Sequence, residues 1–383
     1  MIMKKFNFSE AEKIVIKLGS SIITNDGDGL DEECLASLIK QISVLRSQNK
    51  KIILVSSGAI AAGLKKLGIK KRPKILSELQ SAAAVGQMDL VQIYERLFSD
   101  NSLIAAQVLL THDDLSNRKR YLNARSTIFN LINNDVVPII NENDTVASEE
   151  IRFGDNDSLA AMVANLIEAD ILVLLTDQEG LFSEDPREND NARLIHHGFV
   201  DDKSLDELAS GTKSEIGTGG MATKILAARR AALSGAHTVI ASGRRDRILI
   251  DLNNDEDIGT FLQSREFKLI ARKKWLADNL KSNGRIYIDQ GAEKALIKEG
   301  KSLLAVGVTK VTGVFDRGEV IQCVNQSGHE ILKGLVNYNA EEVKKLIGVS
   351  SDKIESILGY VNESSLIHRN NMIIIPTVRK ENE

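Results

Sequence analysis

The sequence predicts an α/β protein: a three-layer αβα domain with a doubly wound, mainly parallel sheet, followed by a small β-rich domain. As far as about residue 265, short runs of aliphatic and β-branched residues alternate with helical patterns. These runs are apolar at nearly every position, which is typical of strands covered by helices on both faces of a sheet. Beyond about residue 280, shorter runs are separated by frequent turn residues, as in small β domains.

Six apolar runs predict the strands of the first sheet, at 13–19, 51–58, 103–110, 136–141, 170–177 and 237–242. Between them, apolar residues at helical spacing predict helices at 31–48, 113–133, 156–169 and 221–234. Strands alternating with helices indicate crossover connections, so the strands should be parallel. Ligands of such sheets bind beyond the carboxyl ends of the strands, so we expect the functional site where these runs end.

The chain of 383 residues is long enough for two domains, each with its own hydrophobic core. We expect a first domain over residues 1–265, a basic connecting segment over 266–280 and a second domain over 281–383. All the candidate site residues lie in the first of these, which should therefore be the catalytic unit.

Composition and charge limit the class of partner. With 43% hydrophobic residues, 27% charged residues and a formal net charge of −4, the chain is expected to be soluble, without a basic surface for nucleic acids or membranes. No apolar run suits a signal peptide or a membrane span. Cys34 and Cys323 lie far apart and outside any metal-binding spacing, so both should be reduced thiols. We expect a cytoplasmic protein that acts on a small molecule.

Residues 217–224, GTGGMATK, place glycines and a lysine at the start of a predicted helix. Backbone N–H groups at a helix N-terminus bind anions, and glycine allows a ligand to approach them closely. Lys224 is unfavourable near the positive end of the helix dipole unless an anion lies between them. The motif therefore favours a phosphate site over a plain turn, although its spacing is not that of a P-loop.

Polar residues also follow other predicted strands. Lys17, near the end of the first strand, could extend to solvent or point a second cation into the site. Ser57, in SSGAIAAG, could bind a carboxylate or phosphate, or simply cap a helix. Asn141 and Asp144, in INENDTV, could hold an ammonium group or form a hydrated turn.

The stretch GDND places Asn156 and Asp157 at the start of the predicted helix 156–169. Acids and amides are common there as helix caps, so capping and ligand binding both remain open from these residues alone. Two lysines, an acidic cluster and a polar pocket together indicate phosphoryl transfer, which needs mainly positioning and neutralisation of negative charge. No general base is obvious, and none is needed if the acceptor is a carboxylate, which is already ionised at neutral pH.

Six motifs, in this order, resemble those of the bacterial glutamate 5-kinase family: IVIKLGSSIIT, VSSGAIAAG, VVPIINENDTV, GDNDSLAA, LLTDQEGLF and GTGGMATK. In the second domain, SLLAVGVTKVTGVFDRGEVI resembles the PUA domain appended to those enzymes. The resemblance implies the amino acid kinase fold and ATP-dependent phosphorylation of the side-chain carboxylate of L-glutamate to L-glutamyl 5-phosphate, the first step of proline biosynthesis. It also implies Mg²⁺ as a cofactor, proline as a possible feedback inhibitor, and a homo-oligomer, either dimer or tetramer.

The resemblance further implies roles for single residues. Lys17 and Lys224 would contact the phosphates, and Asp157 would orient the two lysines. Glutamate would be bound by Ser57, Asn141, Asp144 and Asn156. The nucleotide would be bound by Lys17, Thr176, Asp177, Thr218, Gly219, Gly220, Met221, Ala222, Thr223 and Lys224. No residue is assigned to Mg²⁺, and Arg152 departs from the family pattern, which has lysine before FGDND.

Two alternatives remain. Another enzyme of the same fold, such as an acetylglutamate or aspartate kinase, would act on a different acid, but SSGAIAAG, NENDTV and the appended domain favour glutamate. The second alternative is an RNA-binding protein, because PUA domains elsewhere bind RNA. Residues 281–383 contain 14 basic and 13 acidic residues, which is not the basic surface expected for RNA binding.

Overall fold

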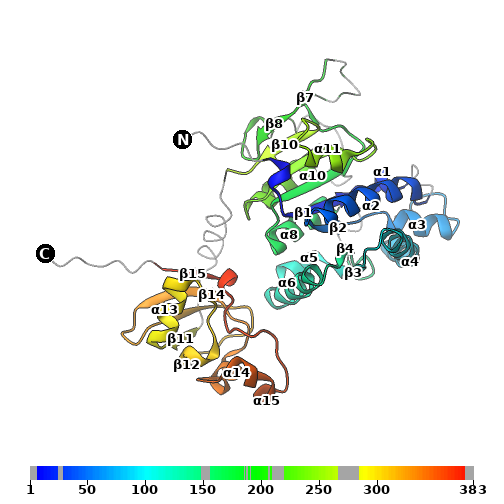
Figure 1. Cartoon of the computed structure of the whole chain (residues 1–383). Helices are drawn as coiled ribbons and strands as arrows, with labels where there is room; N and C mark the ends of the chain where they lie inside the picture. The colour runs from blue at the N-terminus through cyan, green and yellow to red at the C-terminus, as the bar shows by residue number, and fades with distance from the viewer. Residues whose placement is uncertain are drawn as a thin grey trace. The chain divides into compact units, whose positions relative to one another are not determined.

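The computed structural model describes residues 7–24, 29–147, 156–265 (without 185, 187, 188, 190, 206, 207 and 209–219) and 284–375. The chain divides into two compact units, Met1–Ala271 and Arg272–Glu383, whose elements are labelled in Figure 1. The expected connecting segment 266–280 lies outside the described residues, so the domain boundaries given above stay a prediction.

The first unit is built on an eight-stranded sheet with the order β3-β4-β2-β1-β5-β9-β10-β8. Every neighbouring pair is parallel except β9 and β10. Its strands are β1 (Lys13–Leu18), β2 (Lys51–Val55), β3 (Ala105–Leu110), β4 (Val137–Glu142), β5 (Ile171–Thr176), β8 (His197–Phe199), β9 (His237–Ser242) and β10 (Thr260–Gln263). A separate antiparallel pair is formed by β6 (Leu181–Phe182) and β7 (Leu194–Ile195). The predicted mainly parallel sheet is confirmed, and each of the six predicted strands is present.

Helices cover both faces of this sheet. They are η1 (Phe8–Glu10), α1 (Ser20–Ile23), α2 (Glu32–Ser47), α3 (Ala59–Lys66), α4 (Leu76–Asp100), α5 (His112–Ser116), α6 (Arg118–Asn133), α8 (Asp157–Ile167), α10 (Met221–Ala232) and α11 (Ile248–Asn253). The single helix predicted at 113–133 is divided, because Asn117 ends α5 and its side chain caps α6. The long helix α4 is not among the predicted helices.

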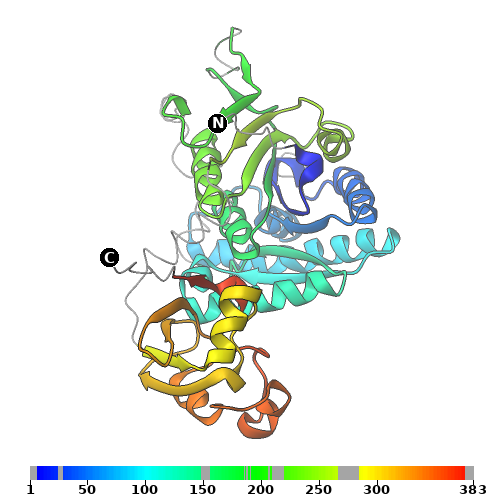
Figure 2. The same cartoon turned by 60° about the vertical axis from the view of Figure 1, so that its left-hand side comes forward.

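Alternate residues of each strand face opposite helical layers. In β1, Ile14 and Ile16 pack in a core with residues of α2, α4 and α11, whereas Val15 packs in a core with residues of α6, α8 and α10. Figure 2 shows α8 and α10 on one side of the strands and α2 on the other. Because side chains alternate along a strand, Lys17 lies on the same side as Val15, toward α8 and α10.

The second unit has a five-stranded sheet with the order β12-β11-β13-β14-β15, antiparallel except for β11 and β13. Its elements are β11 (Gly284–Ile288), α13 (Gln290–Glu299), η2 (Ala305–Gly307), β12 (Val308–Gly313), β13 (Val320–Val324), β14 (Glu330–Leu335), α14 (Ala340–Lys345), η3 (Ser351–Lys353), α15 (Ile354–Leu358), η4 (Arg369–Asn371) and β15 (Met372–Ile374). A separate hydrophobic core includes Ile286, Ile321 and Tyr338. The predicted small β-rich domain is confirmed.

Cys34 is half-buried in the first unit and Cys323 is buried in the second, and neither forms a disulfide. Burial raises the pKa of both thiols, which makes them poor nucleophiles at neutral pH. Among the described residues, no helix has the length and apolar character needed to cross a membrane.

Helices α3 and α4 approach each other closely at two glycines. A Cβ atom on Gly63 would lie 1.7 Å from the carbonyl oxygen of Ala82, and one on Gly86 would lie 1.9 Å from that of Ala59. Both obstacles are backbone atoms, which cannot move aside as the end of a long side chain can. Glycine is therefore needed at both positions although it is a poor helix former.

Replacing Gly86 by alanine should destabilise the protein. The gain in helix propensity is about 1 kcal/mol, but a Cβ forced against the backbone of α3 requires the two helices to separate, and such overpacking costs about 1–3 kcal/mol or more. Urea unfolding should therefore show a lower midpoint for Gly86→Ala. The control Ser77→Ala, at an exposed position of the same helix, should leave the midpoint nearly unchanged, and an equally unchanged midpoint for Gly86→Ala would contradict the close approach.

Candidate active site

A buried carboxylate, that of Asp157, lies between two lysines at the centre of the candidate site. Its Oδ1 is 2.6 Å from Nζ of Lys17, and its Oδ2 is 3.1 Å from Nζ of Lys224. The hydroxyl of Thr223 also donates to Oδ2, at 3.2 Å. All three charged residues are buried. The structure thus brings together three residues that come from separate motifs, while their catalytic roles stay a prediction.

Three elements of the first unit position these side chains. Lys17 belongs to β1 and faces α8 and α10, as its neighbour Val15 does. Asp157 is the first residue of α8, and Lys224 lies in the first turn of α10. Both helices therefore direct their N-terminal turns at the same point near the carboxyl end of β1. Their N–H groups add a partial positive charge there.

The side chains at the start of α8 do not act as helix caps. The N-cap residue is Asn156, but its side chain makes no capping hydrogen bond, and the carboxylate of Asp157 binds the lysines instead. Of the two interpretations left open by the sequence, the structure therefore favours a role other than capping.

Opposite charges are in contact at this centre. Burial raises the pKa of Asp157, but the ammonium groups of Lys17 and Lys224 outweigh that effect and hold the pKa well below its usual range. The carboxylate therefore stays ionised and holds two ammonium groups at one buried point. Ammonium groups at such a point can neutralise an anion such as a phosphoryl group.

Polar side chains gather where β2 and β4 end. Nδ2 of Asn156 donates to the backbone oxygen of Ser56 at 2.5 Å and to Oδ1 of Asn141 at 2.8 Å. Asn141 in turn donates to Oε1 of Gln87 on α4, at 2.8 Å. The hydroxyl of Ser57 is buried and forms no hydrogen bond within the described part of the chain. A buried polar atom without a partner is unusual, so this hydroxyl is well suited to bind a ligand.

Asp144 lies in the turn that follows β4. Burial raises its pKa to about 7, the nearby carboxylate of Glu142 adds to this increase, and Arg72 acts in the opposite direction. Carboxyl groups that titrate near neutral pH are common in functional sites. Asp144 can therefore change its charge within the range in which enzymes work.

The structure describes some of the predicted nucleotide-binding residues but not all of them. At the end of β5, the hydroxyl of Thr176 donates to Oδ1 of Asp177 at 3.0 Å. The described residues of the glycine-rich motif, at the N-terminus of α10, are Gly220, Met221, Ala222, Thr223 and Lys224. Thr218, Gly219 and the divergent Arg152 lie outside the described residues.

Comparison with known proteins agrees with this geometry. Residues 12–242 match the amino acid kinase family and residues 284–358 match the PUA domain. A protein named glutamate 5-kinase from Nitrosomonas eutropha is 56% identical, covering 97% of this chain and 100% of its own. The chain belongs to the glutamate 5-kinases of the amino acid kinase family.

Other relatives support the same family. A glutamate 5-kinase from Nitrosospira multiformis is also 56% identical, over 96% of this chain and 98% of its own. Among solved structures, a UMP kinase from Bacillus anthracis covers 67% of this chain and 97% of its own. Its TM-score of 0.47 and identity of 13% are too low to add to the assignment. The family assignment therefore depends on the sequence relatives and the two domain matches.

Two residues of this chain that contact the polar side chains where β2 and β4 end were not predicted. Gln87 holds Asn141, and the hydroxyl of Tyr94 lies 2.8 Å from the hydroxyl of Ser56. Burial raises the pKa of Tyr94 well above its usual range, so its phenol stays protonated. Both residues lie on α4. No local pattern distinguishes them in the sequence, because α4 contains other glutamines and several charged residues.

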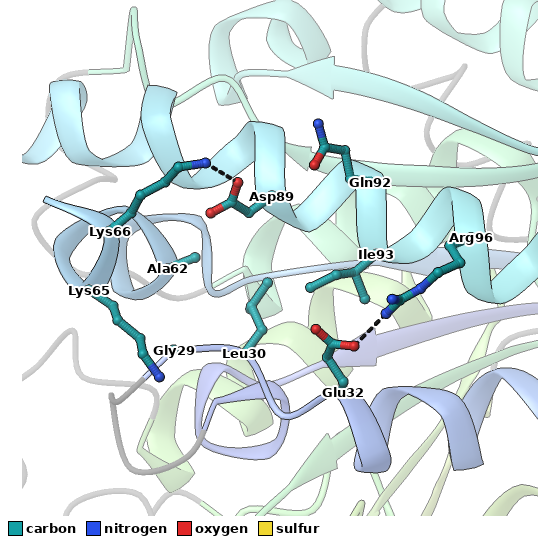
Figure 3. A pocket seen from close by; sticks show the side chains of 10 residues that line it. All are labelled: Gly29, Leu30, Glu32, Ala62, Lys65, Lys66, Asp89, Gln92, Ile93 and Arg96. Atoms are coloured by element: carbon teal, nitrogen blue, oxygen red, sulfur yellow. Dashed lines mark hydrogen bonds and ion pairs between the residues drawn. The ribbon is translucent and has the colours of Figure 1, made fainter.

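A cleft of about 740 Å³ is formed by side chains of α2, α3 and α4 together with Gly29 and Leu30 (Figure 3). Four of its charged side chains form two pairs, Lys66 with Asp89 and Arg96 with Glu32. None of the predicted site residues lines this cleft. The cleft is therefore not part of the candidate active site.

Among the described residues, no group of three or more histidine, cysteine, aspartate or glutamate side chains is placed to hold a metal ion. Both oxygens of Asp157 already bind lysines. Mg²⁺ commonly binds through substrate phosphates and water with only one or two carboxylates, so the described residues suit a metal that arrives with a nucleotide.

Replacing Asp157 by asparagine should lower stability in a pH-dependent way. The change removes the carboxylate that pairs with both buried ammonium groups, so the free energy of unfolding should fall by about 3–5 kcal/mol at pH 7. Because the folded-state pKa is lowered, the carboxylate stabilises the fold above its unfolded pKa of about 4, and this contribution is lost as the pH falls further. The difference from wild type should be constant from pH 8 to about 5 and then narrow.

Urea unfolding of both proteins at pH 8, 6, 5 and 4 would measure this difference. The control is Asp257→Asn, which removes an exposed carboxylate that contacts His197. An exposed pair contributes about 0–1 kcal/mol, so the control should change little at any of these pH values. If Asp157→Asn lowers the free energy of unfolding as little as the control does, the ion pairs of the buried centre do not stabilise the fold.

Proposed function

We propose that this chain transfers the γ-phosphoryl group of ATP to the side-chain carboxylate of L-glutamate, giving L-glutamyl 5-phosphate and ADP as the first step of proline biosynthesis. The observation that carries the proposal is the buried centre of Lys17, Asp157 and Lys224, in a chain that belongs to the glutamate 5-kinases. Its two ammonium groups suit a transferring phosphoryl group, and the polar side chains around Asn156 suit a small polar acceptor.

The reaction needs positioning and charge neutralisation rather than a base. A carboxylate oxygen of glutamate, ionised at neutral pH, forms a bond to the γ-phosphorus while the bond from this phosphorus to the β–γ bridging oxygen breaks. The electron pair of that bond leaves with ADP. Lys17 and Lys224 neutralise the charge on the phosphoryl oxygens, and Asp157 holds both lysines in place.

Each predicted substrate residue contacts a different group of L-glutamate or supports one that does. The carboxylate of Asp144 accepts the ammonium group of glutamate, and the hydroxyl of Ser57 donates to an oxygen of the substrate. Asn156 uses its amide N–H groups within the protein, so its oxygen remains to contact the ligand. Asn141 keeps Asn156 in this orientation and lies beside it at the end of β4.

The nucleotide is bound at the N-terminus of α10 and the end of β5. Backbone N–H groups of residues 220–224 contact its phosphates, together with Thr218 and Gly219, and Thr176 and Asp177 contact the remainder. Mg²⁺ would be held mainly by the phosphates of ATP and would supply charge neutralisation there. Inhibition by proline and assembly into a dimer or tetramer stay predictions from the family resemblance, and RNA binding by the second unit is not part of the proposal.

Trapping of the product with hydroxylamine tests the reaction. The purified chain should form glutamyl hydroxamate only when ATP, Mg²⁺ and L-glutamate are all present, because only an acyl phosphate reacts rapidly with hydroxylamine. Acetylglutamate and aspartate serve as competing acceptors. Release of phosphate without hydroxamate, or faster reaction with one of the other acids, would refute the proposed activity.

The pH dependence tests the role of Asp144. With a pKa of about 7, it changes from mostly neutral at pH 6 to mostly ionised at pH 8, and only the ionised form attracts the substrate ammonium group. The value of kcat/KM for glutamate should therefore rise by about tenfold over this range. Asp144→Asn should lower kcat/KM and remove the rise. The exposed control Asp113→Asn should retain it, and a rise that persists in Asp144→Asn would assign it to another group.

A further inference from the structure

Glu142, the last residue of β4, is a buried carboxylate that the proposed reaction does not use. It is only 4% exposed, and neither of its carboxylate oxygens accepts a hydrogen bond from any described residue. Because strand residues alternate, Glu142 faces the same side as Ile140, whose core includes residues of α6 and α8, whereas Asn141 contacts Gln87 on α4. A buried charge with so few partners is costly and calls for an explanation.

The imidazole ring of His112 connects Glu142 to α8. Its Nδ1 lies 3.5 Å from Oε2 of Glu142, and its Nε2 lies 3.2 Å from Oγ of Ser158. His112 is the first residue of α5, where Thr111 forms a capping box with Asp114. Strand β3 ends directly before this turn and is parallel to β4, with Leu110 opposite Glu142. The end of β3 therefore places the ring beside the end of β4.

Ser158 lies next to Asp157 in the first turn of α8. Its hydroxyl also accepts a hydrogen bond from the guanidinium group of Arg230, which belongs to α10. The contacts that begin at Glu142 therefore end where α8 meets α10, the two helices that carry Asp157 and Lys224. Phosphoryl transfer is sensitive to such positions, since displacement of a reacting group by about 1 Å can reduce the rate by about 100-fold.

We propose that His112 is a positioning residue for phosphoryl transfer. By bridging Glu142 and Ser158, it fixes the first turn of α8, and with it Asp157, relative to the substrate residue Asn141 at the end of β4. This inference rests on the proposed function. An imidazole ring suits the role because it is rigid and its two nitrogens can contact two different partners. The carboxylate beside Nδ1 sets the orientation of the ring, and Nε2 then faces Ser158.

Loss of the bridge should leave the body of α8 in place. The helix buries Leu159, Val163, Leu166 and Ile167, which hold it against the sheet independently of Ser158. What the bridge constrains is the N-terminal turn, where no apolar side chain precedes Leu159 in the helix. The effect should therefore be seen in kcat rather than in the overall fold.

The test uses the full chain, with kcat, both KM values and the melting temperature measured for wild type, His112→Ala, Glu142→Gln and the double variant. His112→Ala should lower kcat by about tenfold or more, with both KM values within about twofold, because the displaced turn affects the transition state more than binding. It should also lower the melting temperature, since Glu142 loses its partner. Glu142→Gln should keep kcat within about threefold, because a glutamine oxygen at the same place keeps a polar contact with Nδ1 of His112.

The double variant separates positioning from stability. Removing the unpaired charge should restore the melting temperature, but kcat should stay low because the bridge to Ser158 is still missing. Recovery of kcat together with the melting temperature, or an unchanged kcat in His112→Ala, would overturn the proposal. His197→Ala is the control, since this histidine also contacts a carboxylate, that of Asp257, and should alter neither quantity. A wild-type chain that forms no hydroxamate would overturn the proposed function and this inference with it.

Discussion

The carboxylate of Asp157, buried between the ammonium groups of Lys17 and Lys224, is the interaction on which the rest of the site depends. Burying three charged groups costs several kcal/mol per ion, and their mutual attraction commonly does no more than offset that cost. The two ammonium groups also repel each other. In the proposed reaction, the phosphoryl group places further negative charge beside them.

Much of this arrangement is readable from local sequence. Strands covered on both faces give nearly continuous apolar runs, so the six strands of the first sheet could be predicted, and Lys17 is conspicuous as the cation within one of them. The glycine-rich motif before Lys224 and the acidic start of α8 are local patterns as well. What brings them together is the parallel sheet, which collects the carboxyl ends of its strands at one edge.

The features that were not predicted depend on contacts between distant segments. Helix α4 has several small residues where it lies against the backbone of α3, at Gly86 among others. Small residues weaken the apolar pattern by which a helix is predicted from sequence. Gln87 and Tyr94 were missed with it. The antiparallel strand β10 depends on its pairing with the distant strand β9. The predicted helix 113–133 is divided because the side chain of Asn117 caps α6. The bridge through His112 requires the register of β3 with β4, which no local pattern contains.

The end of β4 shows why polar residues gather at this edge of the sheet. Within the strand, Ile139 and Ile140 must both be apolar, because a helical layer covers each face. Two residues later the same alternation continues, but the side chains are Asn141 and Glu142, which still point to opposite layers. Asn141 meets α4 on one side, and Glu142 meets His112 and thereby α8 on the other. Adjacent residues can thus serve substrate contact and helix positioning separately, because the pleat of the strand sends them to opposite sides.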